Sequence, residues 1–175
     1  MQRSLVATGG TVLASKLAIN YGISCNTAGG SHHANYNGGA GYCVFNDVAV
    51  AAHYLLNRGL ANKILIVDLD VELEDNLEDV AYINTLKHYL NGLNQENFDF
   101  VFYIAGVDIH YNDRLGKLKI SDEGIKSRDE LVIENFFSKR IPFCGVLGGG
   151  YNKDFNKLVE LHSILHKSCA KYIGL

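Results

Sequence analysis

Apolar residues along this chain gather in short runs that alternate between two kinds of spacing. Runs of consecutive apolar residues predict strands at 23–27, 63–69, 98–105 and 143–147. The run at 63–69 is typical of a strand buried on both faces of a sheet. Apolar residues at helical spacing predict helices at 4–20, 48–58, 78–91, 122–138 and 154–172. This alternation indicates an α/β fold, a parallel sheet with helices on both faces.

The composition is that of an ordinary globular chain. Its 175 residues are 47% hydrophobic and 20% charged, so we expect a single domain over 1–175 and no long disordered region. Sixteen Lys and Arg against 19 Asp and Glu give a net charge of −3 without a basic cluster, which argues against direct nucleic-acid binding. No apolar run is long enough to span a membrane, and the first residues do not resemble a signal peptide. We therefore expect a cytoplasmic protein.

Four cysteines occur, none with the spacing of a zinc knuckle or a redox motif. Cys25, Cys43, Cys144 and Cys169 are widely separated and have apolar neighbours. Buried free thiols in a reducing compartment are the interpretation that this pattern favours.

Polar side chains follow each of the four predicted strands. In parallel sheets of this kind, ligands bind beyond the carboxyl ends of the strands. The candidate residues at those ends are His32, His33, Asp68, Asp70, Asp108 and Tyr151.

These residue types together indicate metal-assisted amide hydrolysis. Histidine suits proton transfer at neutral pH, and Asp68 and Asp70 lie on one side of their strand. One of the two can bind a metal while the other orients a histidine, and a tyrosine can stabilise an oxyanion. Alternatives are a polar surface pair for the histidines and solvated carboxylates for the aspartates. A phosphate-binding loop at 148–151 is disfavoured because neither glycine fingerprint for phosphate occurs there.

Several ordered motifs resemble the histone deacetylase family of the arginase/deacetylase fold. They are GGSHHA at 29–34, GYCVFNDVA at 41–49, VDLDV at 67–71, AGVD at 105–108, DRLG at 113–116 and GGGY at 148–151. The chain is most similar to the compact bacterial and class IV-like deacetylases. The resemblance implies a three-layer α/β/α fold, here truncated.

The resemblance also implies roles for the matched positions. Asp70 and Asp108 would be ligands of Zn²⁺, with Fe²⁺ as an alternative ion. His33 would be the general base and His32 its electrostatic partner, oriented by Asp68.

The remaining matched positions concern the substrate, which would be acetyl-lysine or a small acylated amine. Tyr151 would polarise the scissile carbonyl, while Gly41 and Tyr42 would line the acyl-lysine channel. Asp113 and Arg114 could form a pair that braces the loop in which they lie, after the third predicted strand.

Two departures from the family pattern affect the expected function. Glu72 stands where the family has its histidine metal ligand, and the chain then runs straight towards the next helix, which indicates an internal deletion. The segment from Arg3 resembles the middle of a family member, so an N-terminal part is expected to be absent as well. Losing a strand exposes the edge of its neighbour.

We therefore expect a zinc-dependent deacetylase-type amidohydrolase with impaired activity. The alternative is a non-catalytic remnant, or a module that binds acyl-lysine without turnover. A two-metal ureohydrolase-like enzyme is disfavoured, since further Asp and His ligands near the metal motif are missing.

Overall fold

The computed structural model describes residues 1–70, 76–93 and 95–173. Its single sheet is parallel throughout and has the strand order β1-β4-β3-β2. The strands are β1 (Ile23–Asn26), β2 (Ile64–Asp68), β3 (Phe100–Ala105) and β4 (Phe143–Leu147). The helices are α1 (Gln2–Tyr21), α2 (Asp47–Asn57), α3 (Asp79–Leu93), α4 (Asp122–Phe137) and α5 (Phe155–Ala170), followed by a 3-10 turn, η1 (Lys171–Ile173).

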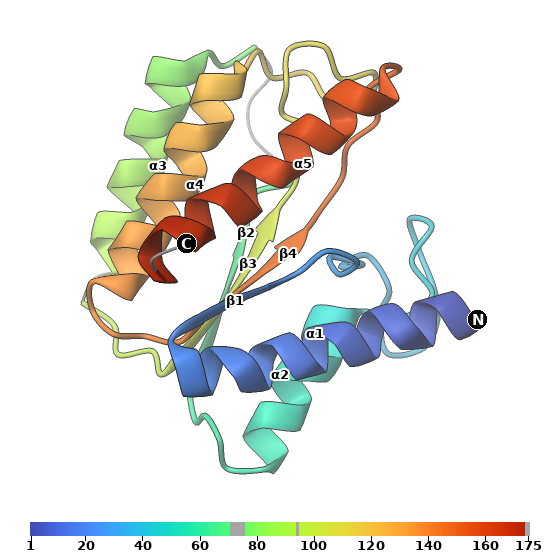
Figure 1. The fold of residues 1–175 in the computed structure, drawn as a ribbon, viewed down its shortest axis with the longest axis vertical. Helices are drawn as coiled ribbons and strands as arrows, with labels where there is room; N and C mark the ends of the chain where they lie inside the picture. Colours follow the sequence, from blue (N-terminus) through green and yellow to red (C-terminus); the bar gives the residue numbers. More distant parts are fainter. Residues whose placement is uncertain (71–75, 94, 174–175) are drawn as a thin grey trace.

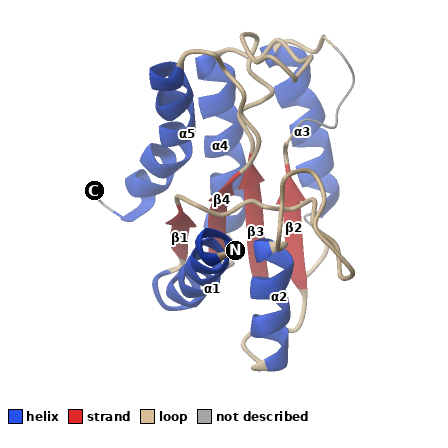
Figure 2. Ribbon diagram, turned by 90° about the vertical axis from the view of Figure 1, so that its right-hand side faces the viewer, coloured by secondary structure: helices blue, strands red, loops and turns tan. Residues whose placement is uncertain are grey.

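The helices form one layer on each face of the sheet. Helices α1 and α2 cover one face, and α3, α4 and α5 cover the other (Figures 1 and 2). The predicted α/β fold, a truncated three-layer α/β/α architecture, is thus confirmed, and each predicted strand and helix is present.

Side chains at the helix starts explain where several helices begin. The Asn46 side chain accepts a hydrogen bond from Ala49 N–H at the start of α2, and Asp154 accepts from the first turn of α5. Ser121 does the same at α4. Such caps satisfy N–H groups that have no partner within the helix.

The core lies on both faces of strand β3. All six of its residues are buried. Val101, Tyr103 and Ala105 pack among residues of α3, α4 and α5, whereas Phe100 and Phe102 pack among residues of α1 and α2. This alternation is what a strand between two helical layers requires.

Strand β2 corrects the prediction that the run at 63–69 is buried on both faces. It is one of the two edge strands of the sheet and, among the described residues, pairs with β3 only. Val67 is buried under α3, but the Ile66 side chain on the opposite face is 45% exposed. The described part of the chain therefore does not bury every apolar side chain of this run.

The cysteines correct a second prediction. All four are free, as predicted, but only Cys144 and Cys169 are buried. Cys25 is partly exposed, and Cys43 lies in a loop where its Sγ is 3.4 Å from the Gly41 carbonyl oxygen. None of the described helices is both long and apolar enough to cross a membrane.

Candidate active site

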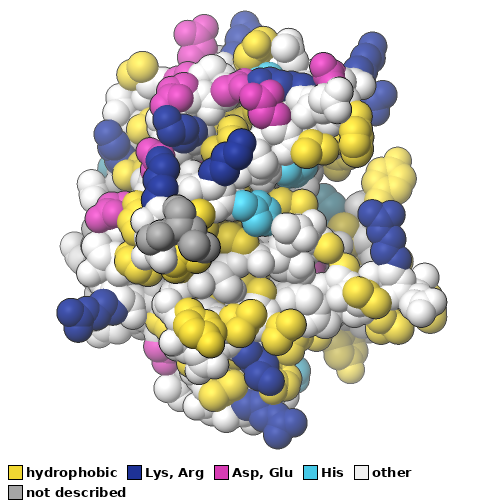
Figure 3. Space-filling model, in the orientation of Figure 1, with side chains coloured by type: hydrophobic (Ala, Val, Ile, Leu, Met, Phe, Trp, Pro, Cys, Tyr) yellow, Lys and Arg dark blue, Asp and Glu magenta, His cyan; other side chains and the backbone are white. Residues whose placement is uncertain are grey.

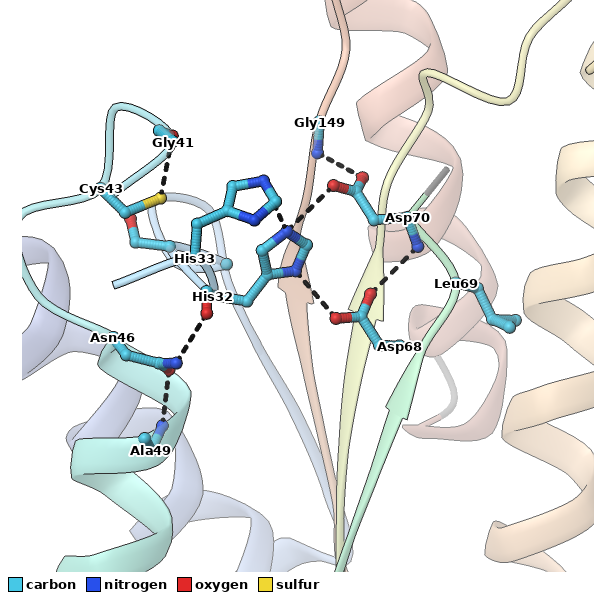
Figure 4. Close-up of polar contacts among 12 residues, drawn as sticks. His32, His33, Gly41, Cys43, Asn46, Ala49, Asp68, Leu69, Asp70 and Gly149 are labelled. Atoms are coloured by element: carbon cyan, nitrogen blue, oxygen red, sulfur yellow. Dashed lines mark hydrogen bonds and ion pairs between the residues drawn. The ribbon is translucent and has the colours of Figure 1, made fainter. Parts of the chain in front are cut away.

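The candidate site lies at the carboxyl ends of the strands, where the loops after β1, β2, β3 and β4 meet. His32 is the central residue (Figure 4). Its Nδ1 lies 2.9 Å from Oδ2 of Asp68, and its Nε2 lies 3.2 Å from Oδ2 of Asp70. Asp68, and then Asp70, raise the pKa of His32 to about 10 although burial opposes this. His32 is therefore a cation between two carboxylates at neutral pH.

His33 stands beside His32 on the open side of the site. The two Nε2 atoms are 3.0 Å apart, and His33 is the more exposed residue. Gly41 packs directly against the His33 ring: a Cβ at this position would lie 2.5 Å from Cδ2 of His33. Since Gly41 also has a φ of +51°, the position requires glycine on two counts.

Two polar residues at the start of α2 fix the histidine loop. Buried Asp47 accepts hydrogen bonds from the N–H groups of Gly30 and Ser31. The Asn46 side chain donates to the carbonyl oxygen of His32 at 2.8 Å. The contacts of these two residues with the histidine loop were not predicted from the sequence.

The two predicted metal carboxylates converge on the loop after β4. Oδ1 of Asp70 accepts the Gly149 N–H at 2.6 Å (Figure 4). A Cβ at Gly149 would lie 2.0 Å from Oδ2 of Asp108 and 2.9 Å from Oδ1 of Asp70. Burial raises the pKa of Asp70, but hydrogen bonds from His32 and Gly149 outweigh burial and hold it below its usual value. Asp70 is thus ionised.

The loop that carries Tyr151 is braced from the loop after β3. Asp113 accepts the Tyr151 N–H at 2.6 Å, and Arg114 Nε donates to the Tyr151 carbonyl oxygen at 3.0 Å. The pair was predicted to brace its own loop; in the structure the two residues hold the backbone of Tyr151. Burial, and then the charges of Asp108 and Asp70, raise the pKa of the Tyr151 phenol, so at neutral pH it remains a hydrogen-bond donor.

Sequence reasoning missed Arg128, which supports the site from beneath. Its Nη1 lies 2.5 Å from the Gly106 carbonyl oxygen and 3.5 Å from that of Leu69, so it ties together the ends of β2 and β3. Its Nε donates to Asp129, which also accepts the Tyr103 hydroxyl at 2.6 Å. The sequence feature that could have indicated this role is the adjacent pair of opposite charges, Arg128 and Asp129, among the apolar residues of α4.

The described residues form neither the predicted substrate channel nor the full set of predicted zinc ligands. Tyr42 is fully exposed, so it stands at an open rim, and the channel role of Gly41 and Tyr42 stays a prediction. Glu72 lies outside the described residues. Catalytic zinc normally has three protein ligands, and the family's set is represented here by Asp70 and Asp108 alone. The described residues therefore do not supply the complete zinc site of the family.

Comparisons with known proteins give the family of the chain. The family model described as histone deacetylase domain matches residues 1–72 and 70–164. An uncharacterized protein of Picosynechococcus sp. is 39% identical, over 96% of this chain and 69% of its own length. Histone deacetylase 2 of Arabidopsis thaliana is 32% identical, over 86% of this chain and 50% of its own length. The acetoin utilization protein AcuC of Staphylococcus aureus (strain MRSA252) is 31% identical, over 73% of this chain and 46% of its own length.

The chain belongs to the histone deacetylase family, which is a family of deacetylase-type hydrolases. It spans about half the length of the named deacetylase and AcuC relatives. The two matched segments overlap at 70–72, so these residues fit both the end of one segment and the start of the other. The alignment with the Picosynechococcus protein covers 207 residues, more than the 175 of this chain. An alignment longer than the chain means that the relative has residues in the aligned region that this chain lacks. That they are missing directly after β2 stays a prediction.

Proposed function

We propose that this chain is a zinc-dependent deacetylase-type amidohydrolase whose hydrolysis of acetyl-lysine, or of a similar acylated amine, is slow. The observation that carries the proposal is the contact of His32 with Asp68 and Asp70, with His33 3.0 Å away. These are the positions at which the chain matches the family motifs, and they meet at one edge of the sheet.

Each side chain has a role in the active form of such a site. His33 is the general base, and the cation of His32, held by Asp68, stabilises developing negative charge next to it. Asp70 and Asp108 are the carboxylate ligands of Zn²⁺, or of Fe²⁺ as an alternative.

The substrate side of the proposal rests on the exposed loops. The Tyr151 phenol donates a hydrogen bond to the carbonyl oxygen of the scissile amide, and Asp113 and Arg114 hold its backbone in place. Gly41 and Tyr42 form the rim against which the acyl-lysine chain lies. The cytoplasmic location, the single-domain organisation and the absence of nucleic-acid binding stay predictions from the sequence.

Slow turnover follows from the incomplete metal site. With one of three protein ligands unmatched, the ion is held weakly, and a positioned base alone contributes only about 10²–10⁴-fold to the rate. The alternative, an acyl-lysine binding module without turnover, is favoured by the break in the family match at 70–72.

The test is turnover of a fluorogenic acetyl-lysine peptide by the purified chain with Zn²⁺. We expect weak activity that His33→Ala and Tyr151→Phe both abolish. Activity that neither substitution changes would refute the proposed roles. Robust activity lost in both variants would instead refute the impairment. Peptide binding without turnover would establish the alternative.

A further inference from the structure

A second set of metal ligands lies within the site, beside the carboxylate pair that the family pattern assigns. Among the described residues, His32, His33 and Asp70 each offer a ligand atom, and these atoms lie within 4.8 Å of one another. Asp108 is not a member of this group. This set therefore includes both His33, the general base of the family pattern, and His32, its electrostatic partner.

The two ligand-ligand distances that involve His32 are close to those around a tetrahedral ion. Nε2 of His32 is 3.0 Å from Nε2 of His33 and 3.2 Å from Oδ2 of Asp70. Zinc with ligands at about 2.0–2.2 Å separates neighbouring ligand atoms of a tetrahedron by about 3.3–3.5 Å. The imidazoles of His32 and His33 and the Asp70 carboxylate point towards one another in Figure 4. The third pair, His33 and Asp70, lies within 4.8 Å, so closing on one ion requires mainly that these two side chains approach each other.

Each ligand is also held from behind. Nδ1 of His32 lies 2.9 Å from Asp68, an arrangement in which a carboxylate orients a metal-binding histidine. The second oxygen of Asp70 accepts the Gly149 N–H, and Gly41 packs against the His33 ring. Two histidines and one carboxylate are a known donor set of zinc sites that keep one position open.

The charges favour a cation at this point. Asp68 and Asp70 flank His32, whose own side chain is only 10% exposed. Nε2 of His32 faces both Oδ2 of Asp70, at 3.2 Å, and Nε2 of His33, at 3.0 Å. A divalent ion at this point would lie next to the Asp70 carboxylate and near that of Asp68, which would compensate its charge.

We propose that this chain binds a divalent ion of the zinc type through His32, His33 and Asp70 instead of through Asp70 and Asp108. The inference rests on the proposed function: it describes where the ion lies in the resting chain, whereas the roles given above to His33, Asp70 and Asp108 belong to the active form of the site. A nitrogen that binds a metal cannot accept a proton, so an ion held in this way removes His33 as a general base. Slow hydrolysis is then a consequence of where the ion sits as well as of the missing ligand.

The test is the affinity of the full chain for Zn²⁺ alone, measured in competition with a chromogenic chelator. His33→Ala and Asp70→Asn should each weaken binding at least about 10-fold, and Asp68→Asn by about 10–100-fold. Asp108→Asn should weaken binding much less than His33→Ala does. His53→Ala, at an exposed histidine of α2, is the matched control for binding at surface histidines.

Folding of each variant is checked by circular dichroism. His33 is exposed, so its substitution keeps the test valid even if a change at His32 or Asp70 destabilises the fold. Zinc affinity that Asp108→Asn lowers and His33→Ala leaves intact would overturn the proposal, as would a chain that binds no zinc. Peptide turnover is measured separately, and its absence with histidine-dependent zinc binding would refute the proposed function alone.

Discussion

Strands β2 and β3 are neighbours in one sheet, and each leads into a carboxylate of the site, but they are supported very differently. All of β3 is buried, and the strand is paired on both sides. Strand β2 is paired on one side only, and Ile66 is 45% exposed. Asp108 therefore follows an interior strand, while Asp70 follows an edge strand and comes directly before the break in the family match.

This difference means that the two carboxylates of the site are held in place by different kinds of contact. The Asp108 side depends on the packing of a fully buried strand. On the other side, Asp70 is held by Gly149 and His32 across the loops. The ligand geometry around Asp70 can therefore change without loss of the fold.

Arg128 is the contact common to both strands, and its loss should have the largest effect. Arg128→Met removes the donor to the Gly106 and Leu69 carbonyl oxygens and leaves the carboxylate of Asp129 buried without its cation. Breaking a buried ion pair from one side costs about 3–5 kcal/mol. Urea unfolding should show this loss.

Lys126→Met, at an exposed position of the same helix, is the matched control and should change the free energy of unfolding by less than about 0.5 kcal/mol. Equal effects of the two substitutions would mean that Arg128 does not join the strand ends.

The two strands can be compared directly by truncating one apolar side chain in each. Phe102→Ala should lower the free energy of unfolding by about 3–5 kcal/mol, because the side chain is fully buried. Ile66→Ala should cost less than about 1.5 kcal/mol, since much of that side chain is already in water. A cost at Ile66 similar to that at Phe102 would show that β2 is covered in solution.

The sequence was enough to predict the strands and helices and the meeting of His32, Asp68 and Asp70. Periodicity reports which faces are apolar, and parallel strands bring their carboxyl ends to one edge. It was not enough to predict the exposure of Ile66, because an apolar run does not show whether a covering neighbour is present. The buried contacts of Arg128 and Asp47 depend on tertiary approach, which local pattern does not encode.

A smaller, pH-dependent effect should come from His162 of α5, which packs behind the loop after β4. Burial, and then the charges of Arg128 and His166, lower its pKa to about 4, against a weaker opposing effect of Asp70. The unfolded chain, with the usual pKa near 6.5, binds a proton that the folded chain does not. Stability from this residue is therefore complete above pH 6.5 and is lost as the pH falls towards 4.

Between pH 7 and pH 4.5 the loss attributable to His162 should be about 2–3 kcal/mol, and His162→Leu should remove it. Urea unfolding at the two pH values checks this. An unchanged acid sensitivity in His162→Leu would show that the loop after β4 does not exclude charge from this position.

The most direct test of the altered metal site is X-ray absorption at the zinc edge of the zinc-loaded chain. The account predicts two imidazole ligands and one carboxylate ligand, at about 2.0–2.2 Å, with the imidazole signal reduced to one ligand in His33→Ala. A shell of oxygen ligands alone, unchanged in His33→Ala, would contradict it and would place the ion between Asp70 and Asp108.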